Sequence, residues 1–179
     1  MHSTTIHQTY HDRRQIPYLV RDARVEDAPE LINLLNRVGQ EEIYIADEKA
    51  QIPVEQEAAI IRHRNPEVQL ILVAEQEGAI AGSLEMVRGV LKKNAHTAIF
   101  GMALHPEFRG RGIGRGLLGS AEQWARGVGV QKVSLAVFAS NHAAIRLYAG
   151  LGYEEEGRRY RQYRILGEWV DEIWMARWL

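Results

Sequence analysis

The stretch FRGRGIGRGLL, residues 108–118, determines how the rest of the sequence is interpreted. It has four glycines at alternating positions, and three arginines stand among them. Because glycine has no Cβ atom, the backbone N–H groups of such a loop approach a ligand closely. The apolar residues Ile113, Leu117 and Leu118 indicate that a helix begins inside the stretch, and a helix N-terminus attracts anions. The stretch is therefore typical of a phosphate-binding loop, which several classes of protein possess.

The size and composition are those of a globular protein with balanced charge. The 179 residues are 46% hydrophobic and carry a formal net charge of -1, which argues against general nucleic-acid binding. The arginines within residues 158–164 form either a local basic patch or the solvated face of a strand. We therefore expect no nucleic-acid partner.

Several other classes of site and location are excluded by what the sequence lacks. There is no cysteine, so neither a disulfide scaffold nor a thiolate metal site is available. The histidines at 2, 7 and 11 are irregularly spaced, and we expect no metal site there. The N-terminus has no signal-peptide core, and no run reaches the roughly 18 apolar residues of a membrane helix. We expect a cytoplasmic protein without membrane contact, with a disordered N-terminal extension over 1–17 and a single domain over 18–179.

The spacing of apolar residues predicts an ordered series of strands and helices. Alternation predicts a strand at 18–24, and helical periodicity predicts helices at 26–39 and 53–64. Three β-rich runs then predict an antiparallel meander at 68–76, 79–91 and 95–105. After the glycine loop we expect a helix that ends near residue 128, a strand at 132–139, a short helix at 140–152, and a closing hairpin of 153–165 with 168–179. This order predicts an α/β protein of the α+β kind.

Two common nucleotide-binding motifs do not match the loop. A dinucleotide fingerprint needs Gly-x-Gly-x-x-Gly, but the sixth position is Arg115 when counted from Gly110 and Leu117 when counted from Gly112. A nucleoside triphosphate loop needs a Gly-Lys-Ser/Thr triplet, which the sequence does not contain. A nucleotide-binding module is therefore a poor interpretation.

The pattern Arg109-x-x-Gly112-x-Gly114, between a predicted strand and a predicted helix, resembles the phosphate motif of the GNAT superfamily of acyl-CoA-dependent N-acetyltransferases. A second signature of that superfamily is matched downstream by Asn141, Ala144, Tyr148, Gly152 and Tyr153. The resemblance implies one mixed, mostly antiparallel twisted sheet of about seven strands, flanked by about four helices and with splayed central strands.

The resemblance also implies a binding site for acetyl-CoA. The N–H groups of the glycine loop would hold the pyrophosphate, with Arg109 and Arg111 adding charge-assisted bonds and Arg115 remaining solvated. The preceding strand would pair its backbone with the pantetheine arm, and Asn141 would either contact the cofactor or cap a helix. The expected cofactor-binding residues are Met102, Ala103, Leu104, Arg109, Gly110, Arg111, Gly112, Ile113, Gly114, Arg115 and Asn141.

The catalytic groups that the resemblance suggests are less completely specified. Tyr148 would donate a proton to the departing thiolate, unless it is a helix tyrosine that packs on the sheet. The sequence does not identify a single general base. Glu85 lies between apolar residues, where burial would raise its pKa, but it is equally a solvent-facing strand residue. His96, a water chain or the acceptor's own deprotonation are the alternatives.

The expected activity is acetyl transfer from acetyl-CoA to a primary amine of a small molecule, by direct attack in a ternary complex. The alternatives are acetylation of a protein N-terminus or lysine, and a non-catalytic acyl-CoA-binding regulatory domain. Acceptor choice is expected to depend on residues 27–64 and on the closing hairpin. The acidic and aromatic residues Glu41, Glu42, Tyr44, Asp47 and Glu48 either favour a cationic amine or form a solvated face. We also expect a homodimer.

Overall fold

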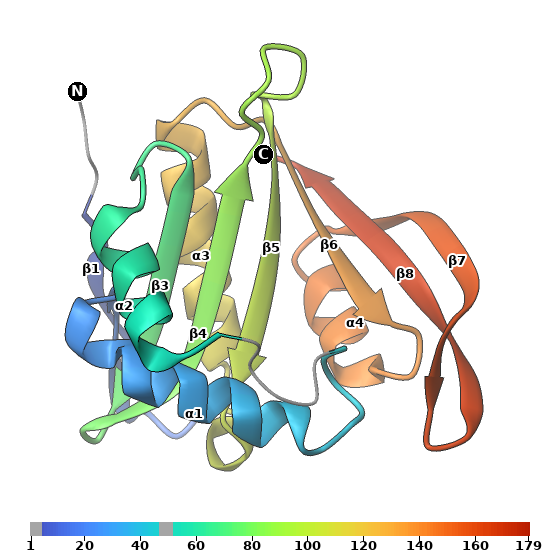
Figure 1. Cartoon of the computed structure of the whole chain (residues 1–179), viewed down its shortest axis with the longest axis horizontal. Coiled ribbons are helices and arrows are strands. Elements are labelled where there is room, and N and C mark those ends of the chain that lie inside the picture. The colour runs from blue at the N-terminus through green and yellow to red at the C-terminus, as the bar shows by residue number, and fades with distance from the viewer. Residues whose placement is uncertain (1–4, 47–51) are drawn as a thin grey trace.

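The computed structural model describes residues 5–46 and 52–179, in which eight strands form one sheet and four α-helices cover it (Figure 1). The strand order is β1-β2-β3-β4-β5-β6-β8-β7. The strands are β1 (His7–His11), β2 (Pro17–Asp22), β3 (Gln69–Gln76), β4 (Ala79–Arg88), β5 (Thr97–Leu104), β6 (Lys132–Phe138), β7 (Glu154–Ile165) and β8 (Glu168–Trp178). The helices are α1 (Ala28–Gly39), α2 (Val54–His63), α3 (Ile113–Gly127) and α4 (His142–Ala149).

This architecture confirms the expected fold class, with one strand more than the seven expected. The additional strand, β1, lies in the segment 1–17 for which the sequence predicts a disordered extension. From residue 5 onward that prediction is wrong, because β1 pairs antiparallel with β2 and Ile6 is buried. The Tyr10 and Tyr18 rings stack with their centroids 5.6 Å apart, so the extension contributes to the apolar core.

The helices divide between the two faces of the sheet, with α1 and α2 on one face and α3 and α4 on the other (Figure 1). The larger core lies between α3 and the sheet, where Leu117, Leu118 and Ala121 are fully buried. These apolar residues occupy one face of α3 at helical spacing, as the sequence predicts. Trp124, on the same face, donates its indole N–H to the carbonyl of Pro66 at 2.9 Å.

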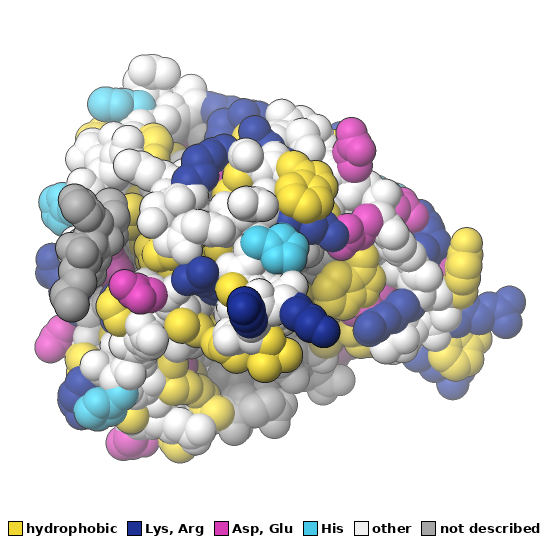
Figure 2. Space-filling view, turned by 90° about the horizontal axis from the view of Figure 1, so that it is seen from above, with side chains coloured by type: hydrophobic (Ala, Val, Ile, Leu, Met, Phe, Trp, Pro, Cys, Tyr) yellow, Lys and Arg dark blue, Asp and Glu magenta, His cyan; other side chains and the backbone are white. Residues whose placement is uncertain are grey.

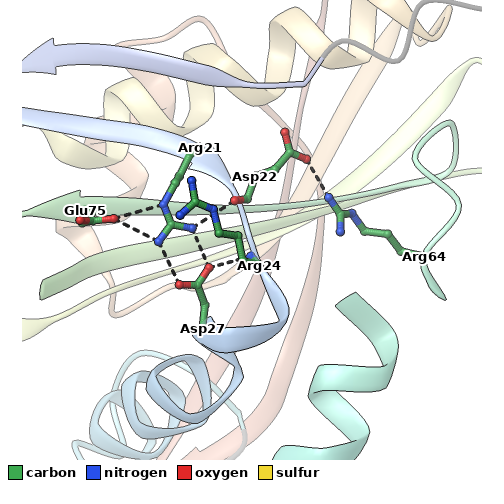
Figure 3. A network of polar contacts seen from close by, with 6 residues as sticks. All are labelled: Arg21, Asp22, Arg24, Asp27, Arg64 and Glu75. Atoms are coloured by element: carbon green, nitrogen blue, oxygen red, sulfur yellow. Dashed lines mark hydrogen bonds and ion pairs between the residues drawn. The ribbon is translucent and has the colours of Figure 1, made fainter. Parts of the chain in front are cut away.

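A buried ionic network attaches α1 to the sheet (Figure 3). The Arg21 guanidinium donates to both carboxylate oxygens of Asp27, at 2.6 and 2.9 Å, and to Glu75 at 3.1 Å. Close by, Arg64, at the end of α2, pairs with Asp22 at 2.8 Å. A buried arginine is tolerated only when its charge is paired. The network therefore holds the start of α1 and the end of α2 against β2 and β3. The loop between α1 and α2 therefore has defined ends.

The two central parallel strands separate from each other, as expected. β5 and β6 pair at three positions, the last being Ile99 opposite Ser134. Beyond Ile99 the two strands diverge, and Figure 1 shows the gap widening toward α4. The backbone of β5 stays paired with β4 through Leu104. One edge of β5 is consequently without a strand partner along residues 100–104.

The surface carries both signs of charge. The face seen in Figure 2, on which the loop between β4 and β5 lies, has basic, acidic and hydrophobic side chains interspersed. On β7, Arg158 pairs with Glu155 and Asp171, and Arg159 pairs with Glu172. These pairs favour an ion-paired strand face over a basic patch. Within the described ranges, no helix has the length and apolarity needed to cross a membrane, and no cluster of metal-ligating side chains is present.

Candidate active site

A cleft of about 1090 Å³ lies where β5 and β6 separate. One wall is β5 with the glycine loop, the other is β6 with α4, and the turn between β1 and β2 closes one end. The cleft brings together most of the residues that the sequence predicts for the site. Those that line it are Met102, Ala103, Leu104, Arg109, Gly110, Arg111, Gly112, Gly114, Arg115, Asn141 and Tyr148. Ile113 and Glu85 do not line it.

The glycine loop presents an uncapped helix N-terminus to the cleft. Gly112 is the N-cap of α3 with φ +93°, in the left-handed region that glycine adopts readily, and no side chain caps the helix there. The first N–H groups of α3 therefore remain available, and the helix dipole adds partial positive charge. Ile113 is 1% exposed, so its side chain belongs to the core and only its backbone can serve a ligand.

Two further glycines of the stretch, in the first turns of α3, lie in close packing. A Cβ atom on Gly114 would lie 3.2 Å from Met102 Cε and 3.3 Å from Leu147 Cδ2, where β5, α3 and α4 meet. A Cβ atom on Gly116 would lie 2.2 Å from the hydroxyl oxygen of Tyr18. Gly116 thus allows α3 to pack against β2.

Arg109 makes contacts in this structure that the sequence does not predict. Its guanidinium forms a bidentate ion pair with Glu41, at 2.7 and 2.6 Å, and lies 4.3 Å from the ring centroid of Tyr44. Its Nε donates to the carbonyl of Leu104 at 3.0 Å. Arg109 therefore connects the end of β5 to the loop after α1, and it also lines the cleft. The four residues Arg109, Glu41, Tyr44 and Leu104 are called the loop clamp below.

Arg111 is better placed than Arg109 to serve an anion. Its Nε is buried without a hydrogen-bond partner among the described residues, and its Nη1 lies 3.4 Å from Gln76 Oε1. A second cation, Arg13, comes from the turn between β1 and β2. Its backbone N–H donates to the Arg111 carbonyl at 2.8 Å, and its guanidinium donates to the Gly110 carbonyl at 3.2 Å. Arg13 was missed because its segment was predicted to be disordered.

The position of Tyr148 is compatible with both interpretations that the sequence leaves open. It packs in the core, with its ring centroid 5.7 Å from that of Phe100 in an edge-on arrangement, and it also lines the cleft. Burial raises the pKa of the Tyr148 phenol to about 12. The hydroxyl is therefore protonated at neutral pH and can act as a proton donor. Asn141 caps α4 by accepting from the Ala144 N–H at 3.1 Å, at the wall of the same cleft.

The two candidate bases lie outside the cleft. Of the two interpretations of Glu85, the structure agrees with the solvent-facing one, because alternation along β4 turns Leu84 and Met86 toward the core and Glu85 outward. Its carboxylate is exposed and accepts from Gln69 Nε2 at 2.6 Å. His96 is also exposed, at the start of β5, and does not line the cleft. Neither group touches the place where β5 and β6 separate.

A buried carboxylate that sequence reasoning missed lies on the opposite wall. Glu172 of β8 is 6% exposed and lines the cleft beside Phe138 and Tyr163. It accepts from the Tyr163 hydroxyl at 2.9 Å and from Trp174 Nε1 at 2.8 Å. The signal was present in the sequence, because two adjacent acids in an alternating strand place one of them on the inner face.

The remaining acidic residues of the predicted acceptor side are dispersed. Glu41 belongs to the loop clamp, and Glu42 is exposed. Asp47 and Glu48 lie outside the described residues. The expected acidic cluster is therefore not assembled by the two glutamates that the structure describes.

Comparisons with known proteins agree with this geometry. The family model described as "Acetyltransferase (GNAT) family" matches residues 29–153. The L-amino acid N-acetyltransferase AaaT of Escherichia coli is 31% identical over 110 residues, which span 59% of this chain and 66% of that protein. The match thus covers just under two thirds of the relative's own length.

Solved structures show the same fold. A GNAT-family acetyltransferase from Streptococcus pneumoniae superimposes with a TM-score of 0.84 and 28% identity, covering 90% of this chain and 99% of that one. The YncA structure from Salmonella typhimurium, a putative acetyltransferase with its cofactor acetyl-CoA, has a TM-score of 0.81 and 22% identity, covering 90% and 94%. From the family match, the fold and the two sequence signatures, the chain belongs to the GNAT family of acetyltransferases.

Proposed function

We propose that the protein is an N-acetyltransferase that transfers an acetyl group from acetyl-CoA to a primary amine of a small molecule, such as an amino acid, a polyamine or an antibiotic. The observation that carries the proposal is the uncapped N-terminus of α3, which faces the same cleft as the buried Tyr148. A relative with a named amino-acid acetyltransferase activity and a similar structure that holds acetyl-CoA support it.

The donor is proposed to lie along β5 with its pyrophosphate at the glycine loop. Residues 102–104 have no strand partner on the β6 side, so their N–H and C=O groups can pair with the pantetheine amides as an added strand would. The N–H groups after Gly112 donate hydrogen bonds to the phosphates, and the side chains of Arg111 and Arg13 provide positive charge beside them. Asn141, which lines the far wall, is proposed to lie near the pantetheine.

The proposed reaction is direct attack by the neutral amine on the thioester carbonyl carbon. The tetrahedral intermediate collapses with cleavage of the carbon–sulfur bond, and the leaving thiolate takes a proton from the Tyr148 hydroxyl. The amine nitrogen loses a proton to water, and the Tyr148 phenolate regains a proton from water, so charge and atoms balance. The raised pKa of Tyr148 keeps this proton in place until the thiolate forms.

Calorimetric titration of acetyl-CoA into the Gly112→Glu variant tests the donor site. A side chain at φ +93° is strained, and its carboxylate would repel the phosphates, so we expect binding to be lost. Gly129→Glu is the matched control, because Gly129 also has a positive φ, of +82°, but does not line the cleft. If Gly112→Glu remains folded and binds acetyl-CoA with unchanged affinity, the phosphate loop is assigned wrongly.

A homodimer in the cytoplasm is a further part of the proposal. The hairpin of β7 and β8 exposes Tyr160, Leu166 and Trp169, with 78%, 72% and 60% of their surfaces accessible. Apolar side chains at the end of a long hairpin are suited to contact a second copy. The absence of cysteine is compatible with a reducing compartment. Light scattering on the purified protein gives the mass directly, and a monomer at all concentrations would contradict the dimer.

A further inference from the structure

A pair of opposite charges lies at one wall of the cleft, with Glu172 lining the cleft and Arg159 outside the lining. Arg159 of β7 and Glu172 of β8 are register partners, and Arg159 Nη1 lies 3.1 Å from Glu172 Oε2. The Arg159 guanidinium also lies 5.2 Å from the ring centroid of Trp174. The Glu172 side chain is 8% exposed and lines the cleft, whereas that of Arg159 is 56% exposed. The pair therefore has an anionic inner end and a cationic outer end.

Both members of the pair have hydrogen-bonding capacity to spare. A carboxylate offers about four acceptor positions, and Glu172 uses three, toward Arg159, Tyr163 and Trp174. An arginine offers about five N–H donors, and within the described part of the chain Arg159 uses one of them, toward Glu172. A ligand can therefore add one donor at the inner end and a planar acceptor at the outer end without breaking the pair.

The surroundings of the pair are aromatic. Phe138 and Tyr163 pack edge to face with centroids 4.8 Å apart, and both line the cleft beside Glu172. Such a wall excludes water and strengthens charge interactions at its edge. It also favours a ligand whose charges cancel, because an unmatched charge there would lose its hydration without gaining a partner.

Building on the acetyltransferase activity proposed above, we propose that Glu172 and Arg159 select a free α-amino acid as the acceptor. Glu172 accepts a hydrogen bond from the α-ammonium group at the inner end, and Arg159 binds the α-carboxylate at the outer end. The bound ammonium group then loses one proton to water, and the neutral amine attacks the thioester. The zwitterion is neutral overall, as the pair is, so every charge keeps a partner. A polyamine would place positive charge next to Arg159 and offers no carboxylate to pair with it. A peptide N-terminus has a neutral amide at the position where Arg159 would bind the carboxylate of a free amino acid.

Steady-state kinetics on the full-length protein with matched acceptors test this assignment. The acceptors are a panel of free amino acids, their carboxamides and the corresponding decarboxylated amines, at saturating acetyl-CoA. We expect the wild type to have a lower KM for the acid than for its amide. In Arg159→Gln the KM for the acid should rise about tenfold or more, whereas the KM for the amide and kcat for both should change less than about twofold.

Three further variants separate recognition from folding. Arg159→Lys retains the charge and should recover part of the discrimination. Glu172→Gln retains the shape of the side chain and should raise KM for the acid and the amide alike, since both carry the ammonium group. Arg164→Gln removes an arginine of the same strand that contacts Trp169 and the Gly167 carbonyl, and it should behave as the wild type.

The outcomes also distinguish this inference from the proposed function. If amides are acetylated as well as acids, or if Arg159→Gln impairs both equally, the amino-acid assignment is overturned while acetyl transfer stands. If amines or peptides are acetylated and free amino acids are not, the same conclusion follows. If acetyl-CoA releases no thiol with any acceptor, the proposed function itself fails.

Discussion

Replacement of Arg109 by glutamine tests whether this residue organises the acceptor side or holds the donor. In the structure it makes two charge-assisted bonds to Glu41, one bond to the Leu104 carbonyl and a cation–π contact with Tyr44. In the alternative role the guanidinium would leave Glu41 and contact the diphosphate. Arg109→Gln removes the charge in both cases, but the two roles change different kinetic constants.

The magnitude follows from the geometry of the ion pair. Charge-assisted hydrogen bonds contribute about 1.5–3 kcal/mol each when shielded, but the side chains of Arg109 and Glu41 are 26% and 29% exposed, which reduces this figure. We therefore expect a coupling free energy of about 1–2 kcal/mol in a double-mutant cycle of Arg109→Gln with Glu41→Gln. If the released loop carries Tyr44 away from the acceptor, the KM for the amine should rise by about five- to thirtyfold.

Three measurements examine the loop clamp together. Urea unfolding of the two single variants and the double variant gives the coupling energy, initial rates give the acceptor KM, and calorimetry gives the Kd for acetyl-CoA. Both single variants should raise the acceptor KM and leave that Kd within about twofold. The reasoning is refuted if Arg109→Gln alone weakens acetyl-CoA binding by tenfold or more while Glu41→Gln does not, since Arg109 would then act on the diphosphate.

Three other perturbations have defined outcomes. Gly116→Ala should lower the free energy of unfolding by about 1–3 kcal/mol, because its Cβ would lie 2.2 Å from the Tyr18 hydroxyl oxygen. Gly119→Ala in the same helix is the control, because a Cβ there would meet nothing within 4 Å, and it should not destabilise the protein. Denaturant unfolding of both variants measures the difference. Tyr148→Phe should lower kcat by about tenfold or more with the Kd for acetyl-CoA unchanged, and an unchanged rate of thiol release would exclude the proton-donor role. Burial raises the pKa of both Tyr18 and Tyr148 to about 12, so the folded state retains protons that the unfolded state releases. The melting temperature of the wild type should therefore fall as pH rises above about 10, and that of Tyr148→Phe should fall less steeply. A melting temperature that does not change with pH in this range would contradict the burial of the two tyrosine hydroxyls.

The elements that the sequence predicted correctly are those with a strong local pattern. The apolar face of α3, the three-stranded meander and the closing hairpin each follow from spacing that repeats over many residues. β1 was not predicted because its sequence, HQTYH, is mostly polar. It is an edge strand whose pairing with β2, and not its own composition, makes it ordered.

The residues that line the cleft were predicted where one segment supplies them and incompletely where distant segments meet. The glycine loop carries its own geometry, so its place at the cleft could be predicted from the sequence alone. Arg109 bonds a residue 68 positions away in the chain, which no local pattern records. Whether Glu85 or Glu172 is buried depends on strand register, because a shift of one residue along a strand turns a side chain to the other face of the sheet.

The most direct test of the proposed activity is a single end-point assay with two readouts. The purified protein is incubated with acetyl-CoA and, one at a time, with amino acids, polyamines, aminoglycosides and peptides, while free thiol is measured and the acceptor is weighed by mass spectrometry. We predict thiol release that depends on the acceptor, and a product heavier by one acetyl group attached to nitrogen, with both lost in Gly112→Glu. Release of thiol without an acetylated product, or no release with any acceptor while acetyl-CoA binds, would contradict the assignment as an N-acetyltransferase.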